Sequence, residues 1–140
     1  MLKLTFKGEE VKRLFSVVLI IFLCFLINVS GESPAEVLVF YDLNCDHCQE
    51  ILNVFWPPIQ AEKHYDTKYF EVNHLKNYEI LLAIEEQLND KNNEFPIFIV
   101  GEKIFDLYQI EAELPGYLDK HPDEKFKYPD LLTGGEPLDR

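Results

Sequence analysis

A short apolar run that leads into a pair of cysteines constrains the fold of this chain more than any other feature of its sequence. The run Val37-Leu38-Val39-Phe40-Tyr41 is rich in β-branched and aromatic residues, which predicts a buried strand. A three-residue break at 42–44 separates it from Cys45-Asp46-His47-Cys48. We therefore expect the cysteine pair to lie where a strand passes into a helix.

The residues after the pair predict a helix from Cys45 to about Trp56. Four side chains recur at helical spacing and are expected to face a core: Cys48, Leu52, Phe55 and Ile59. Pro57-Pro58 is expected to kink or end this helix, because neither ring nitrogen can donate the helical hydrogen bond.

Further strands and helices are predicted along the rest of the chain. In order they are a strand at Lys68–Val72, a helix at Asn77–Leu88, a strand at Pro96–Val100, a strand at Lys103–Phe105 and a short helix at Ile110–Leu118 that Pro115-Gly116 disturbs. The order β-α-β-α-β-β-α predicts an α/β fold. The first βαβ unit requires a parallel pair of strands, and the hairpin adds antiparallel ones. We expect one mixed four-stranded sheet with helices on both faces.

The N-terminal residues resemble an export signal. Leu14–Val29 is almost wholly apolar, basic residues precede it, and small residues follow it. This pattern predicts either a signal peptide cleaved near residue 31 or a retained membrane anchor. Either one places residues 32–140 outside the cytoplasm, periplasmic or secreted, or tethered to the outer face of the membrane. Cys24 lies inside the apolar run and is interpreted as an apolar filler.

The domain organisation follows from these segments. Residues 1–31 are the expected signal peptide or anchor, residues 32–121 the folded domain, and residues 122–140 a tail. The tail holds several proline and glycine residues. It is expected to be poorly ordered, or held down only by Leu131 and Leu132.

The charge of the chain argues against nucleic acid as a partner. The formal net charge is −12. Because the basic residues concentrate before the apolar run, residues 32–140 are more acidic still. Such a surface repels phosphate groups, and its simplest role is to keep the domain soluble.

The spacing of the two cysteines suits thiol chemistry. A Cys-x-x-Cys disulfide closes only a small ring, so it contributes little loop-closure entropy. It is better suited to thiol–disulfide exchange than to stabilising the fold. We expect Cys45 at the helix N-terminus to attack as a thiolate and a buried Cys48 to resolve the mixed disulfide. A protonated His47 would stabilise the thiolate, and the carboxylate of Asp46 would oppose it. The redox direction therefore stays open.

Two other roles for the cysteines also remain open. A structural disulfide is one, since such bonds are common in secreted domains. A zinc site is the other, completed by histidines such as His64, His74 or His121. A second cysteine pair is absent from the sequence, so no metal ligand and no cofactor is predicted.

Over roughly residues 36–121 the chain resembles the thioredoxin superfamily. Three features carry the resemblance: the strand leading into Cys45-Asp46-His47-Cys48, Phe95-Pro96 at the start of a later strand, and the hairpin followed by a helix. The resemblance implies a thioredoxin-like fold in which Pro96 follows a cis peptide bond and lies against the disulfide. It also implies that the backbone of Phe95 contacts a substrate chain, with Asp46 beside the same site.

The chain also departs from that superfamily. Too few residues precede Val37 for the extra N-terminal strand and helix of full thioredoxins, which leaves a minimal, glutaredoxin-like core. Asn44 stands where an aromatic residue normally precedes the first cysteine. Val39 stands where thioredoxins hold a buried acid, so Glu50 or Asp42 is the expected substitute.

The function that the resemblance implies is thiol–disulfide oxidoreductase activity on protein cysteines outside the cytoplasm. Its catalytic residues would be Cys45, Cys48, His47 and Pro96. The expected partners are protein thiols or disulfides and a redox-recycling protein, either soluble or bound to the membrane. The alternatives are a non-enzymatic binding or assembly module with a stable disulfide and a metal-binding domain.

Overall fold

The computed structural model describes residues 16–18, 33–92 and 94–138. Ser33–Arg140 forms one compact unit, and Met1–Glu32 forms another. Apart from 16–18, which are helical and exposed, the predicted export segment Leu14–Val29 and Cys24 lie outside the described residues. Within the described ranges, no helix is both long and apolar enough to cross a membrane.

The folded unit is built on a mixed four-stranded sheet, as predicted. Its strands are β1 (Glu36–Tyr41), β2 (Asp66–Glu71), β3 (Ile97–Val100) and β4 (Lys103–Phe105), in the spatial order β2-β1-β3-β4. Strand β1 pairs in parallel with β2 and antiparallel with β3, and β3 pairs antiparallel with β4. The mixed α/β class and the four-stranded mixed sheet are therefore confirmed.

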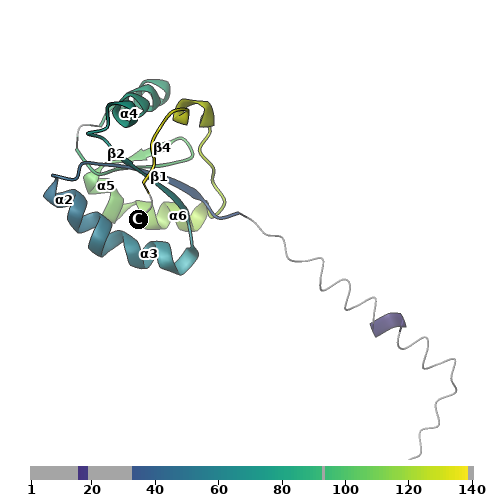
Figure 1. Cartoon of the computed structure of the whole chain (residues 1–140). Helices are drawn as coiled ribbons and strands as arrows, with labels where there is room; N and C mark the ends of the chain where they lie inside the picture. The colour runs from purple at the N-terminus through teal and green to yellow at the C-terminus, as the bar shows by residue number, and fades with distance from the viewer. Residues whose placement is uncertain (1–15, 19–32, 93, 139–140) are drawn as a thin grey trace, which may run out of the picture. The chain divides into compact units, whose positions relative to one another are not determined.

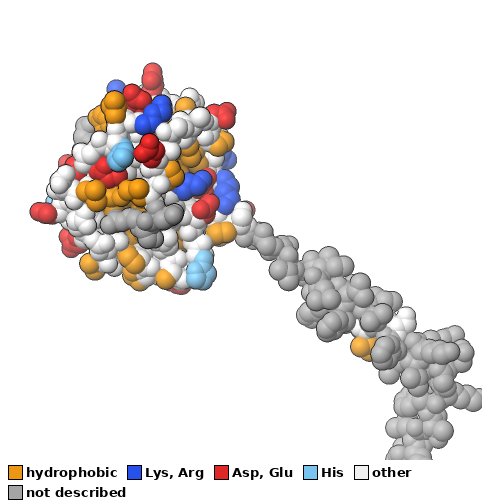
Figure 2. Space-filling view, viewed as in Figure 1, with side chains coloured by type: hydrophobic (Ala, Val, Ile, Leu, Met, Phe, Trp, Pro, Cys, Tyr) orange, Lys and Arg blue, Asp and Glu red, His pale blue; other side chains and the backbone are white. Residues whose placement is uncertain are grey.

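Helices cover both faces of this sheet (Figure 1). They are α2 (Asp46–Glu50), α3 (Trp56–Lys63), α4 (Leu75–Leu88), α5 (Leu107–Ala112) and α6 (Leu114–Lys120). Helix α4 lies on one face, and α2, α3 and α6 lie on the other. Figure 2 shows acidic side chains scattered over the visible face of the unit, among hydrophobic side chains and a few basic ones.

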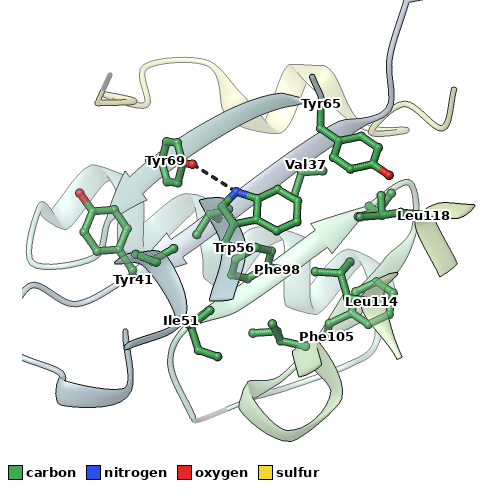
Figure 3. Close-up of a cluster of buried hydrophobic side chains, with 14 of the residues drawn as sticks. Val37, Tyr41, Ile51, Trp56, Tyr65, Tyr69, Phe98, Phe105, Leu114 and Leu118 are labelled. Atoms are coloured by element: carbon green, nitrogen blue, oxygen red, sulfur yellow. Dashed lines mark hydrogen bonds between the residues drawn. The ribbon is translucent and has the colours of Figure 1, made fainter. Parts of the chain in front are cut away.

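Alternate residues of β1 enter two separate cores. Val37, Val39 and Tyr41 pack on the face covered by α3 and α6, whereas Leu38 and Phe40 pack beneath α4. Figure 3 shows the first core, in which the Trp56 indole donates a hydrogen bond to Tyr69 Oη at 3.2 Å. A strand buried on both faces explains why its sequence is an unbroken apolar run and does not alternate with polar residues.

The helix that starts after Cys45 does not end at the prolines. A π-helical segment, Ile51–Phe55, follows α2, and α3 then continues to Lys63. The backbone N–H of Trp56 donates to the Ile51 carbonyl five residues earlier, which marks the widened turn. Pro57 consequently falls in the first turn of α3, where an N–H group is not needed. Of the two expected outcomes, a kink or an end at the prolines, the end of the helix was wrong.

The expected helix at Ile110–Leu118 is two helices. The side chain of Asp106 accepts hydrogen bonds from the backbone N–H groups of Tyr108 and Gln109, and the Gln109 side chain returns a bond to the Asp106 backbone. This capping box starts α5 at Leu107, earlier than predicted. Glu113 separates the two helices, and Pro115 lies in the first turn of α6.

Residues 122–138 pack on the folded unit and are not a loose tail. Leu131 and Leu132 contact the second core, as one alternative expected, and Phe126 is buried there with 5% of its surface exposed. The Leu138 N–H donates to the Tyr69 carbonyl at 2.8 Å. The folded domain therefore does not end at residue 121, because residues 122–138 cover part of the sheet face beneath α4.

Candidate functional site

Cys45 is the N-cap residue of α2. Its backbone is extended, and its Sγ accepts a hydrogen bond from the Cys48 N–H at 3.2 Å. The Cys45 carbonyl accepts the first helical bond, from the Gln49 N–H at 3.2 Å. The thiol is partly exposed. A sulfur in this position receives an N–H group that the helix itself leaves without a partner, an arrangement that favours negative charge on the sulfur.

Cys48 lies one turn further on and is fully buried. Its exposed fraction is 0%, and it packs in the first core. Burial, together with the hydrogen bond and charge of Cys45, raises the pKa of the Cys48 thiol to about 12. The two cysteines are free thiols, so the structure describes the dithiol form. One accessible sulfur and one buried, protonated sulfur therefore share the start of the helix.

Phe95 is brought to Cys45 from fifty residues away along the chain. The Cys45 thiol donates to the Phe95 carbonyl oxygen, with the sulfur and the oxygen 3.7 Å apart. The Phe95–Pro96 peptide bond is cis, and Pro96 is buried at the start of β3. Phe95 also packs against both cores, which fixes its carbonyl group at the edge of the site.

His47 and Asp46 are both exposed on α2. His47 lines a hollow of about 340 Å³ together with Cys45, Glu94, Phe95, Leu107 and Tyr108. A second hollow of about 280 Å³ shares His47, Leu107 and Tyr108 with the first and continues to Glu50, Ile51 and Glu111. We call these two hollows, which share three lining residues, the Cys45 groove. Asp46 is not among the residues that line it.

A polar network that the sequence did not reveal holds the loop before Cys45. Glu71, at the end of β2 and only 3% exposed, accepts a hydrogen bond from the Leu43 N–H at 3.5 Å. The Asn73 side-chain amide donates to Glu71 at 2.6 Å and to Asp42 at 2.9 Å. Asp42 also accepts from the Asn44 N–H at 2.8 Å.

These bonds fix the charge of Asp42. The Asn44 N–H and the Asn73 amide hold the pKa of the Asp42 carboxyl below its usual value. Asp42 is thus a carboxylate at neutral pH. A hydrogen bond with its backbone lowers the pKa of Cys48, and the charge of its carboxylate has a smaller effect that raises this pKa. Glu50, the other acid expected to assist Cys48, is exposed and lines the Cys45 groove. Only the strand-end positions of Glu71 and Asn73 in the sequence hint at this network.

The histidines considered as metal ligands lie apart in the fold. His64 ends α3, His74 precedes α4, and His121 stacks on Tyr117 with ring centroids 4.1 Å apart. Among the residues that the structure describes, no three His, Cys, Asp or Glu side chains gather as metal ligands would.

Comparisons with protein-family profiles, with curated proteins and with solved structures found no match to this chain.

Proposed function

We propose that this protein is a thiol–disulfide oxidoreductase with a thioredoxin-like domain, acting on protein cysteines outside the cytoplasm. The observation that carries the proposal is the unequal pair: Cys45 is accessible and receives an N–H group, and Cys48 is buried with a raised pKa. A nucleophile needs access and a stabilised anion, and a resolving thiol needs proximity to the nucleophile and protection from outside reagents.

The proposed exchange has two steps. The Cys45 thiolate attacks one sulfur of a partner disulfide, a new S–S bond forms, and the other partner sulfur leaves and takes a proton. Cys48 then loses its proton to water and attacks Cys45 Sγ. The Cys45–Cys48 disulfide forms, the bond between Cys45 and the first partner sulfur breaks, and that sulfur leaves and takes up a proton. Two electrons pass from the cysteine pair to the partner. The oxidising direction is the reverse.

The residues around the pair have supporting roles in this proposal. A protonated His47 on the exposed face of α2 would stabilise the Cys45 thiolate. The carboxylate of Asp46 beside it would destabilise that thiolate. Phe95, whose carbonyl accepts from Cys45, would offer its backbone to the partner chain, and Pro96 would shape that edge of the groove. Asp42 stands close to Cys48 and is the acid best placed to influence the proton of that thiol.

Support for the thioredoxin-like fold comes from element order and strand order together. The chain runs β1-α2-α3-β2-α4-β3-β4-α5-α6, with strands in the order β2-β1-β3-β4 and the cysteine pair directly after β1. The location outside the cytoplasm rests on the apolar segment Leu14–Val29. A membrane-bound or soluble redox partner would return the pair to its starting state.

Insulin reduction and refolding of reduced ribonuclease test the proposal in both redox directions. Wild type should be active in at least one assay, and Cys45→Ser should be inactive. Cys48→Ser should accumulate a mixed disulfide between Cys45 and the substrate, because the resolving thiol is missing. Equal and negligible activity in wild type and Cys45→Ser would overturn the proposal.

The complete burial of Cys48 also favours a second candidate, a binding module whose cysteines form a stable disulfide. The reduction potential separates the two. A value well below about −300 mV indicates a structural bond, and a higher value indicates an exchanging one.

A further inference from the structure

We infer that the Cys45 groove binds a cationic, extended segment of the partner protein, with lysine or arginine side chains flanking the partner's reactive cysteine. This inference rests on the proposed function and adds a substrate class to it. The groove passes Cys45 at one end and runs along α2 and α5, so a chain lying in it would place a sulfur beside Cys45.

Three glutamates stand along this groove: Glu94 beside Phe95, Glu50 on α2 and Glu111 on α5. All three are exposed, and none forms an ion pair with a residue that the structure describes. The lysines that do pair lie elsewhere, such as Lys103 with Glu113 and Lys127 with Glu124. The negative charge along the groove is therefore not neutralised from within the described fold.

The segments that build the groove also lack basic residues in their sequences. No lysine or arginine occurs at 32–62, at 92–102 or at 104–119. His47 is the one basic type among the lining side chains. A cleft lined by charges of one sign raises the local concentration of ligands of the opposite sign, so the groove attracts cations and repels anions.

The middle of the groove is apolar and aromatic. Leu107 and Tyr108 line both hollows, and Tyr108 is 70% exposed. The capping box at Asp106 fixes the backbone of Tyr108 through a 3.0 Å hydrogen bond. Lysine and arginine combine an aliphatic stem, which packs on such a surface, with a cationic end that binds aromatic faces and carboxylates. This combination favours a basic peptide over a small inorganic cation.

Peptide binding tests the inference without requiring any redox step. Three labelled peptides of equal length, with serine in place of cysteine and with basic, neutral or acidic flanks, are titrated against the full-length protein by fluorescence anisotropy. The basic peptide should bind about tenfold more tightly than the acidic one at low salt. The difference in affinity between the basic and the acidic peptide should shrink as the salt concentration rises to about 0.5 M, where charges are screened. Tighter binding of the neutral or acidic peptide would overturn the inference.

A charge-matched pair of variants locates the effect. Replacing Glu50, Glu94 and Glu111 together by glutamine should weaken binding of the basic peptide about fivefold or more. The control replaces Glu62, Glu79 and Glu86, which are exposed outside the groove, and changes the net charge equally. Thermal unfolding of both triple variants checks that they fold. Equal weakening in the two variants would overturn the inference, because general charge would then explain the binding.

The same peptides with cysteine restored, presented as mixed disulfides, separate this inference from the proposed function. Charge-selective binding with no exchange at Cys45 would overturn the proposed function and leave the groove assignment intact. Exchange at equal rates with basic and acidic peptides would support the oxidoreductase and overturn the charge preference.

Discussion

The Asn73 side-chain amide donates a hydrogen bond to Asp42 across the gap between two loops, with nitrogen and oxygen 2.9 Å apart. The same amide donates to Glu71 at 2.6 Å. One asparagine thus connects the loop after β1, which carries Cys45, to the loop after β2. Because β1 and β2 are parallel neighbours, both loops leave the same edge of the sheet. The position of the candidate nucleophile depends in part on this connection.

Replacing Asn73 by alanine should loosen the loop before Cys45. Loss of the two amide bonds is expected to lower the free energy of unfolding by about 1 kcal/mol. Amide hydrogen exchange at Leu43 and Asn44 should accelerate more than exchange in β1, and nuclear magnetic resonance measures both. Asn92→Ala is the control, since its side-chain amide bonds to Asp90 in the loop after α4 and not to the loop before Cys45. Unchanged exchange at Leu43 and Asn44 would contradict the role of Asn73.

The sheet was predictable because the residues that specify each strand are adjacent in the sequence. Val37–Tyr41, Pro96–Val100 and Lys103–Phe105 are short apolar runs whose lengths suit strands, and the predicted bounds lie close to β1, β3 and β4. The π-helical segment was not predictable, since proline shows only that an N–H is missing. Whether a helix ends or widens there depends on how Trp56 packs in the first core.

The site was predictable only where residues close together in the sequence form it. The spacing of Cys45 and Cys48 implies one helical turn, and the structure has Cys45 at the N-cap and Cys48 buried. The expectation that Phe95-Pro96 lies at the cysteine site came from the resemblance alone, and the hydrogen bond from Cys45 to the Phe95 carbonyl was not predicted. Asn73 bonds to both Glu71 and Asp42 because β1 and β2 are parallel neighbours, and only the strand-end positions of Glu71 and Asn73 hint at this network in the sequence.

Alkylation under reducing conditions should distinguish the two thiols. At pH 7.5 a thiol with a pKa near 12 is almost entirely protonated, so iodoacetamide should modify Cys45 and leave Cys48 unmodified. Peptide mass spectrometry after a timed quench measures both sites. In denaturant the two rates should become similar, which is the internal control. Equal labelling of the two cysteines in the folded protein would contradict the burial and the raised pKa of Cys48.

The raised pKa of Cys48 also predicts how the stability of the dithiol form depends on pH. The unfolded thiol titrates near 9.0 and the folded one near 12. Below pH 9 both forms keep the proton, and the contribution of Cys48 to stability is fully present. Between these values the unfolded chain releases its proton first, so this contribution is lost as pH rises.

Urea unfolding in the presence of a reductant measures this loss. The difference in unfolding free energy between wild type and Cys48→Ala should be constant up to about pH 8 and should then shift against wild type as pH rises further. The comparison with Cys48→Ala cancels the titration of the tyrosines, which both proteins share. A difference that stays constant from pH 7 to pH 10 would contradict the pKa assigned to Cys48.

Asn77 is predicted to hold the C-terminal segment in place. It is completely buried, and its side chain donates to the carbonyls of Glu71 and Glu136 and accepts from the Glu136 N–H at 2.9 Å. Asn77→Leu removes all three bonds and should destabilise the protein by about 2–4 kcal/mol. Limited proteolysis should then cut first after residue 128. Lys76→Ala, at an exposed neighbouring position, should leave the cleavage pattern unchanged, and identical patterns in both variants would refute this role.

Tyr69 supplies the last prediction, because it links β2 to the helix that follows the cysteine pair. Its hydroxyl accepts from the Trp56 indole at 3.2 Å and donates to Gln60 at 2.8 Å. Trp56 is fully buried, so Tyr69→Phe takes an acceptor from a buried N–H and should cost about 1–3 kcal/mol. Urea unfolding should show a lower midpoint with an unchanged slope, which indicates lost stability in an otherwise intact fold.

Fluorescence gives this prediction a second readout, since Trp56 is the only tryptophan of the chain. Loss of a polar partner at the indole N–H should move the native emission of Tyr69→Phe to shorter wavelength. Tyr78→Phe is the control, because Tyr78 is 41% exposed on α4, on the opposite face of the sheet. If both variants keep the emission and the midpoint of wild type, the Trp56–Tyr69 bond does not stabilise the first core. The helix would then depend on apolar packing alone.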